Sequence, residues 1–200
     1  MKYFIVFSLT LFAFLTPMTA QTEQNEDLPY EQIPDYPEDY TSGNILSRFI
    51  DGLGYRYYWA TEGLRSEDLA YKPSEEARTA RQTLEHLYGL CETIMNAPQR
   101  KANVRPVDWS KMSFEELRKG TLLNLQTASE LCAGKTEREV SEFVMIFQRG
   151  ENATEFPYWN MINGPISDAL WHVGQIVSFR RASGNPLHPG VSVLRGKTRK

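Results

Sequence analysis

Asp168 and His172 lie four residues apart in the stretch SDALWHVGQIVSFRR, residues 167–181. In an α-helix this spacing puts both side chains on one face, where a carboxylate and an imidazole could bind one metal ion. The helix carries so much apolar surface that little of it would be purely solvated. Burying a carboxylate beside an imidazole is costly unless the two are paired or bound to a metal. We therefore interpret Asp168 and His172 as candidate metal ligands.

A usable metal site needs a third protein ligand. The sequence contains three histidines. His188 lies between Leu187 and Pro189 in the C-terminal tail, where a rigid ligand is not expected. His86 flanks the apolar stripe of another predicted helix and is therefore the natural third ligand. Two imidazoles and one carboxylate would leave positions open for water or substrate, which is typical of catalytic metal sites.

Other polar and aromatic residues near these positions have alternative interpretations. From spacing alone, an aspartate four residues before a histidine is also consistent with a simple surface pair. Gln175 and Arg180 are candidates for supporting the site or binding substrate, and packing or surface roles are equally compatible with them. Trp171, Tyr158 and Trp159 are interpreted as core or rim aromatics, with the wall of a ligand pocket as the alternative.

Four long amphipathic segments must position the candidate ligands. They cover residues 43–65, the residues from Thr79 to the helix stop at Pro98, residues 113–132, and the residues from Pro165 to Gly184. Thr79 with Gln82, and Ser113 with Glu116, are capping-box signals at helix starts. Four such segments without a convincing sheet predict an all-α fold, a four-helix bundle. The apolar run FVMIF and the turn signal RGEN predict a long irregular or short-hairpin connection between the third and fourth helices.

The first residues have the layout of a secretory signal peptide. Lys2 precedes an apolar stretch that is short for a membrane crossing, and small residues come before Gln21. We expect residues 1–20 to be cleaved after Ala20, with a membrane anchor as the alternative. The mature protein is then expected to be secreted or periplasmic, without stable membrane insertion after signal cleavage.

The remaining chain divides into three parts. Residues 21–41 form an acidic, proline-containing linker or arm, residues 42–186 the predicted bundle, and residues 187–200 a C-terminal tail. The two cysteines, Cys91 and Cys132, fall on helices that would separate them by roughly 20 Å in a simple hairpin. That separation exceeds the reach of a disulfide. We therefore expect two buried free thiols.

Composition restricts the classes of partner. The 200-residue chain has a net charge of −3, 41% hydrophobic residues and 24% charged residues, which is ordinary for a soluble globular protein. No basic stripe dominates the sequence, so nucleic-acid binding is not expected. We expect a small-molecule substrate of unidentified type and allow for a homodimer.

Two of these stretches together resemble a known family. TARQTLEHLYGL and SDALWHVGQIVSFRR are similar to the DinB/YfiT-like superfamily, and the resemblance spans residues 43–184. It implies a four-helix bundle with a metal triad of one histidine on the second helix and an HxxxH pair on the last. His86 matches the first of these. His172, which opens the run HVGQI, matches the second histidine of the pair. Asp168 replaces the first histidine of that pair.

The aspartate is a departure from the family's pattern. A carboxylate shifts metal preference toward harder ions and lowers the net charge of the site by one. We expect a divalent ion, either zinc, nickel, iron or manganese, at His86, Asp168 and His172. The alternative is a degenerated site in which Asp168 only bonds His172 or a neighbour.

The resemblance implies two enzymatic functions, and the residues leave open a third function without catalysis. Some members are metal-dependent transferases that activate a low-molecular-weight thiol, and some are proposed hydrolases. Export favours metal-assisted hydrolysis, because thiol pools are cytosolic. The sequence identifies no catalytic residue beyond the ligands and predicts no organic cofactor. The third function is a non-catalytic extracellular binding or interaction module with a vestigial metal site, which the acidic arm and the stretch EFPYWN would serve.

Overall fold

The computed structural model describes residues 28–199. The predicted signal peptide, residues 1–20, and the first residues of the predicted arm lie outside the described residues. Within the part of the chain that the structure describes, no helix has both the length and the apolar character needed to cross a membrane.

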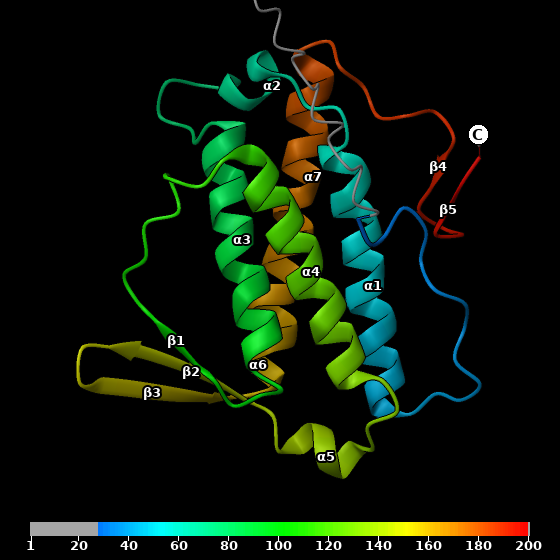
Figure 1. Cartoon of the computed structure of the whole chain (residues 1–200), viewed down its shortest axis with the longest axis vertical. Coiled ribbons are helices and arrows are strands. Elements are labelled where there is room, and N and C mark those ends of the chain that lie inside the picture. Colours follow the sequence, from blue (N-terminus) through cyan, green and yellow to red (C-terminus); the bar gives the residue numbers. More distant parts are fainter. Residues whose placement is uncertain (1–27, 200) are drawn as a thin grey trace, which may run out of the picture.

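Four long helices pack side by side (Figure 1). They are α1 (Ser42–Thr61), α3 (Ala80–Asn96), α4 (Phe114–Cys132) and α7 (Ser167–Ala182). Helix α4 contacts α1 and α3, and α7 contacts the same two helices from the opposite side. Helices α1 and α3 therefore lie diagonally across the group, although α3 is the next long helix after α1 in the chain. Helices α4 and α7 also lie diagonally across the group and also follow one another among the long helices. The segment from α1 to α3 and the segment from α4 to α7 therefore each cross from one side of the group to the other.

Local sequence signals explain where these helices begin. The hydroxyl of Thr79 accepts a hydrogen bond from the Gln82 amide, and the Gln82 side chain accepts one from the Thr79 amide. Ser113 and Glu116 form the same reciprocal pair at the start of α4. Both predicted capping boxes are confirmed, and each satisfies two amides that have no partner within their helix.

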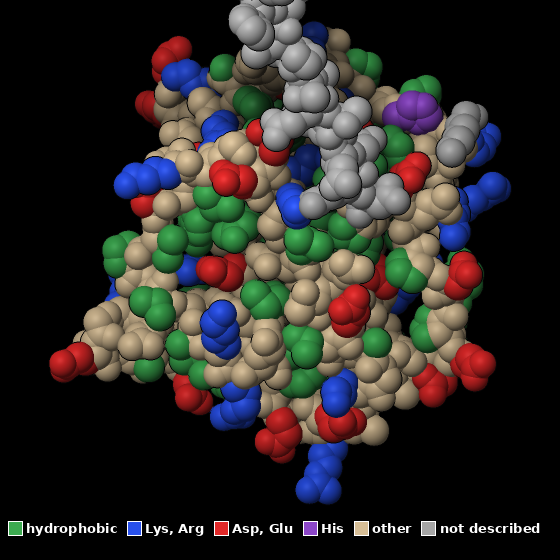
Figure 2. Space-filling view, in the orientation of Figure 1, with side chains coloured by type: hydrophobic (Ala, Val, Ile, Leu, Met, Phe, Trp, Pro, Cys, Tyr) green, Lys and Arg blue, Asp and Glu red, His purple; other side chains and the backbone are tan. Residues whose placement is uncertain are grey.

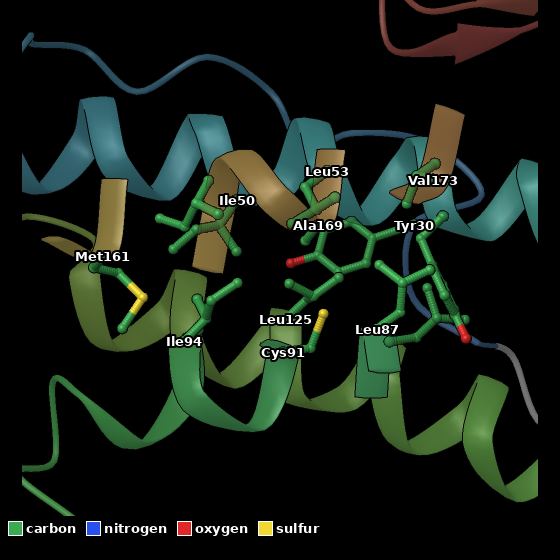
Figure 3. Close-up of a cluster of buried hydrophobic side chains, with 14 of the residues drawn as sticks. Tyr30, Ile50, Leu53, Leu87, Cys91, Ile94, Leu125, Met161, Ala169 and Val173 are labelled. Atoms are coloured by element: carbon green, nitrogen blue, oxygen red, sulfur yellow. The ribbon is translucent and has the colours of Figure 1, made fainter. Parts of the chain in front are cut away.

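The core lies between the four helices (Figure 3). Ile50 and Leu53 of α1 meet side chains from α3, α4 and α7, and all of these are almost fully buried. The labelled members of the cluster from the other three helices are Leu87, Cys91, Ile94, Leu125, Ala169 and Val173. Each fully buried leucine or isoleucine contributes about 1.5–3 kcal/mol through removal of apolar surface from water.

The buried stripe of α7 differs from the predicted one. Its buried apolar residues are Ala169, Val173 and Ile176, whereas Leu170 and Val177 are only partly buried. Helical spacing in the sequence predicts a stripe of Ile166, Ala169, Leu170, Val173 and Val177 and leaves Ile176 outside it. The stripe is rotated because α7 packs against α1 and α3 together, so the deepest residues are those that face the middle of the group.

A small sheet accompanies the helices. Strand β2 (Val144–Arg149) pairs antiparallel with β3 (Asn152–Pro157), and β1 (Ala102–Val104) pairs parallel with β2. The hairpin confirms one of the predicted alternatives for the connection before α7. The sheet as a whole corrects the all-α prediction, because the protein is helix-rich with a small sheet. Strand β1 has three residues with one buried side chain, which is too short for a detectable alternation.

Short elements complete the connections. Helix α1 ends at Thr61, four residues before the predicted end at residue 65. Helix α2 (Ser66–Ala70) follows it. Helix α5 (Glu137–Ser141) precedes the hairpin. Between β3 and α7 lie α6 (Trp159–Met161) and the short π-helical segment η1 (Ile162–Ile166), which includes Pro165.

The arm and the tail pack on the helices. The Tyr30 hydroxyl donates a 3.0 Å hydrogen bond to Asp51 Oδ1 of α1, and the Ile33 amide donates to the Gly196 carbonyl at 2.9 Å. The tail forms a two-stranded ribbon of β4 (Val191–Ser192) and β5 (Lys197–Thr198), which lies beside α1 (Figure 1). The described part of the predicted linker is therefore an ordered arm held between α1 and the tail.

Both cysteines are free and buried, as predicted. Burial raises the pKa of Cys132 to about 11, and it raises the pKa of Cys91 further. Both thiols are therefore protonated at neutral pH, which makes them poor nucleophiles and poor metal ligands.

The contact between the arm and α1 leads to a stability prediction. A Cβ atom on Gly54 would lie 2.5 Å from ring carbons of the buried Tyr30, so Gly54→Ala must displace that ring. We expect this substitution to lower the free energy of unfolding by about 1–2 kcal/mol, as overpacking does. Urea denaturation followed by circular dichroism measures the change.

Gly52→Ala is the matched control on the same helix. A Cβ there would meet only the flexible end of Arg56, at 3.2 Å, and alanine has the higher helix propensity. Gly52→Ala should therefore leave stability unchanged or increase it. Equal destabilisation by both substitutions would contradict the proposed role of the Tyr30 contact.

Candidate metal centre

His86, Asp168 and His172 converge between α3 and α7. His86 Nε2 lies 3.2 Å from Asp168 Oδ2, and His172 Nε2 lies 3.3 Å from Asp168 Oδ1. One potential ligand atom from each residue lies within 4.8 Å of the other two. Two bonds of about 2.1 Å to a shared ion could span the distances between these atoms with little adjustment. These three residues, named here the candidate metal centre, could hold a metal ion.

Buried neighbours set the direction of each candidate ligand. Leu87, Ala169 and Val173 each follow one of the three residues in the sequence and are almost fully buried in the core. Successive helical residues differ by about 100° in direction, so each ligand lies at the edge of the buried stripe rather than in its middle. The side chains of His172, His86 and Asp168 are accordingly 15%, 35% and 41% exposed. The candidate metal centre is thus anchored by the core and still reachable from solvent.

The two imidazoles are arranged around the carboxylate. Their ring centroids lie 4.7 Å apart and the ring planes are nearly perpendicular, at 88°. Each Asp168 carboxylate oxygen lies near one imidazole Nε2. Asp168 is also in the first turn of α7, where the positive end of the helix dipole favours a negative charge.

Gln175 fixes the protonation pattern of His172. The Gln175 Oε1 atom lies 2.7 Å from His172 Nδ1. An amide oxygen only accepts hydrogen bonds, so Nδ1 carries the hydrogen and a neutral ring presents a lone pair at Nε2. That lone pair faces Asp168 Oδ1, which is a second acceptor. Two acceptors at this distance require a cation or a proton between them. These ligand atoms therefore suit a metal ion.

Desolvation favours the neutral, metal-binding form of His86 as well. Partial burial lowers the pKa of His86, the hydrogen bond to Asp168 opposes that change, and electrostatic interactions with the His172 imidazole and the Arg78 guanidinium lower the pKa further. A lowered pKa keeps the imidazole neutral, which is the form that binds metals.

His86 also lines a cleft of about 470 Å³. Its wall includes Arg105 and Trp109 from the connection after α3, and Phe147 and Arg149 from β2. Sequence reasoning missed these residues, because they lie in segments without helical periodicity. The two-residue spacing of Phe147 and Arg149, which puts both on one face of a strand, is a signal that could have identified these two residues.

Two other residues singled out in the sequence have structural roles. Arg180 is buried and donates hydrogen bonds to the carbonyls of Trp59 and Ala60, so it caps the end of α1. His188 packs against the Trp59 ring in the C-terminal segment and is not part of the candidate metal centre.

The aromatic residues near η1 divide between core and surface. Tyr158 is buried in the core and packs edge-to-face on Phe143. Trp159 and Trp171 are 78% and 73% exposed. None of these three lines the cleft beside His86.

No protein-family model, no curated protein and no solved structure matches this chain. Its function is therefore inferred from the chemistry of its own residues.

The lowered pKa of His86 predicts a pH dependence of stability in the metal-free protein. The unfolded chain binds a proton at residue 86 near pH 6.5, whereas the folded chain does so at lower pH. Acidification through pH 6.5 should therefore destabilise the wild type relative to His86→Gln. Urea unfolding of both proteins at pH 7.5, 6.5 and 5.5, with chelator present, measures this difference. A difference that stays constant or grows in favour of the wild type at low pH would contradict the assignment.

The hydrogen bond from His172 to Gln175 predicts a second effect. Gln175→Leu removes the acceptor that holds His172 in its metal-binding tautomer, and loss of such a partner weakens metal affinity by about 10–100-fold. Competition with a chromogenic zinc chelator measures the affinity. Ser178→Ala, which removes another polar side chain from α7, is the control and should bind zinc as the wild type does. Unchanged affinity in Gln175→Leu would show that this contact does not orient the imidazole.

Proposed function

We propose that this protein is an exported, DinB-like metal-dependent hydrolase. In this proposal His86, Asp168 and His172 bind one divalent cation, and the four long helices form a DinB-like four-helix bundle that holds them. The observation that carries the proposal is the convergence of these three side chains within 4.8 Å, across 82 residues of sequence between His86 and Asp168.

The arrangement of helices supports the family assignment. The resemblance implies ligands on the second and fourth long helices, and the candidate ligands lie on α3 and α7, which occupy those places in the chain. The resemblance also implies two ligands one helical turn apart on the last helix, and Asp168 and His172 have this spacing. The replacement of a histidine by Asp168 makes the ligand set harder and more negative than a three-histidine set.

The ligand set is suited to catalysis rather than to structure. Three protein ligands leave coordination positions open, whereas structural zinc sites are usually closed by four. A zinc, nickel, iron or manganese ion held there would supply Lewis-acid chemistry to a water molecule or a substrate oxygen. The protein's own residues position the ligands: Gln175 holds the His172 ring, and the core holds the helices.

Hydrolysis is favoured over thiol transfer by the expected export, and attack by a thiol of the protein itself is excluded separately. Residues 1–20 are expected to direct export, and low-molecular-weight thiols are concentrated in the cytosol. The protein's own thiols, Cys91 and Cys132, are buried and protonated, so they cannot serve as the nucleophile. Water is available in every compartment.

A second candidate function is a non-catalytic interaction module with a vestigial metal site. Two large aromatic side chains, Trp159 and Trp171, are mostly exposed, and exposed tryptophans are enriched at protein interfaces. On the face shown in Figure 2, positive and negative side chains are interspersed. This second candidate requires no bound metal, so metal content separates the two.

Metal content and activity test the proposal together. The untagged wild type should contain or take up one equivalent of divalent metal, measured by elemental analysis after dialysis. His86→Ala and His172→Ala should lose it, because each removes one of three ligands. The protein should also hydrolyse members of an ester and amide panel only when metal is present, without stimulation by added thiols.

His188→Ala is the matched control, since it removes the one histidine outside the candidate metal centre. It should retain both metal and activity. A wild type that takes up no metal would contradict the proposal and favour the interaction module. Activity that depends on an added thiol would favour the transferase function.

A further inference from the structure

The cleft beside His86 carries two arginines. It has a volume of about 470 Å³, within the range of small-molecule sites. We name it the arginine cleft; the side chains used below to define it are His86, Arg105, Trp109, Phe147 and Arg149. His86 belongs to both the arginine cleft and the candidate metal centre, so a molecule in the cleft lies against one of the candidate metal ligands.

Strand β2 directs Arg149 into this cleft. Alternate residues of a strand point to the same face, so Phe147 and Arg149 share one face with the buried Met145. Arg149 is exposed at the end of β2. Within residues 28–199, no side chain forms a hydrogen bond or an ion pair with its guanidinium. Its charge is therefore available to a ligand.

Arg105 is held in place beside the end of β2, where its amide donates a 2.8 Å hydrogen bond to the Gln148 carbonyl. Its guanidinium lies 3.1 Å from a carboxylate oxygen of Glu92 and packs over the Trp109 ring, 5.0 Å from the ring centroid. Further hydrogen bonds to the backbone of Val104 and Gly89 fix its orientation. Glu92 balances one of the two positive charges, so the arginine cleft retains an excess of one positive charge.

The apolar part of the wall includes two aromatic rings. Trp109 packs edge-to-face on Tyr88, and Phe147 packs edge-to-face on Phe156, so both rings are fixed by neighbours. A ligand that fits this cleft would combine an apolar or aromatic body with an anionic group. Guanidinium groups bind carboxylates and phosphates through paired hydrogen bonds.

We propose that the arginine cleft binds small aromatic or apolar organic anions, carboxylates or phosphates, and so selects anionic substrates for the candidate metal centre. The anionic group lies between Arg149 and Arg105, the apolar body lies on Trp109 and Phe147, and the far end reaches His86. This inference rests on the proposed function, because it names the class of substrate that the same site would act on.

Calorimetric titration of the purified protein tests this inference. The probes are benzoate and phenyl phosphate, which distinguish a carboxylate from a phosphate ligand, and neutral benzamide, which has the same ring without the charge. Zinc-loaded and metal-free wild type should both bind at least one of the two anions, and neither should bind benzamide.

Substitutions then locate the binding. Arg149→Gln should weaken the favoured anion by about tenfold or more, because it removes a charge-assisted hydrogen bond. Arg149→Lys should weaken it less, because the charge remains. Arg181→Gln removes an exposed positive charge from a different groove, between α1 and α7, and should leave affinity unchanged. Circular dichroism confirms that each variant is folded.

Three results would overturn the inference: wild type that binds neither anion, Arg149→Gln that binds as the wild type does, or equal weakening by Arg181→Gln. Metal content measured on the same samples separates this inference from the proposed function. One equivalent of zinc without arginine-dependent anion binding rejects the arginine cleft and leaves the proposed function standing. Arginine-dependent binding in a protein that takes up no zinc supports the anion site and rejects the proposed hydrolase.

Discussion

Packing of α3 against α7 is the contact on which the candidate metal centre depends. Leu87 of α3 and Ala169 and Val173 of α7 are buried in one core, and each is the residue directly after a candidate ligand. Close packing of the core therefore fixes the rotation of both helices, and with it the directions of His86, Asp168 and His172. A change of rotation by one residue, about 100°, would remove a ligand from the group. The hydrophobic core thus determines the chemistry as well as the stability.

The electrostatics of the three side chains suit a shared cation. Gln175 accepts the Nδ1 hydrogen of His172, which leaves a lone pair directed at an oxygen of Asp168. Desolvation favours neutral His86. Without a positive charge between them, a neutral His172 and Asp168 would present acceptors to one another in a half-buried space. A divalent ion would coordinate all three side chains at once. A simple ion pair with Asp168 would use only one of the two histidines.

Parts of this arrangement could be predicted from the sequence because they depend on local patterns. The four-residue spacing of Asp168 and His172 and the capping box at Thr79 are local, and the structure contains both. The convergence of His86 with them was inferred by elimination among three histidines and from a family resemblance. The predicted stripe with Val177 in place of Ile176 was wrong, because periodicity alone does not say how many neighbouring helices a helix has.

The arginine cleft could not be predicted because it depends on long-range pairing. Strand β1 is only three residues long, and its parallel pairing with β2 joins segments more than 40 residues apart. That pairing brings Arg105 and Arg149 to the same cleft beside α3. Neither arginine belongs to a motif, and no periodic pattern links them. Arg180, by contrast, stood out in the sequence beside the candidate ligands, and its side chain caps α1 instead.

X-ray absorption spectroscopy of the zinc-reconstituted protein at the zinc edge tests the central claim most directly. We expect a first shell of nitrogen and oxygen atoms at about 2.0–2.1 Å, with the outer-shell scattering of two imidazole rings. A shell that contains sulfur at about 2.3 Å, or one without imidazole scattering, would contradict the assignment of His86, Asp168 and His172 as the ligands.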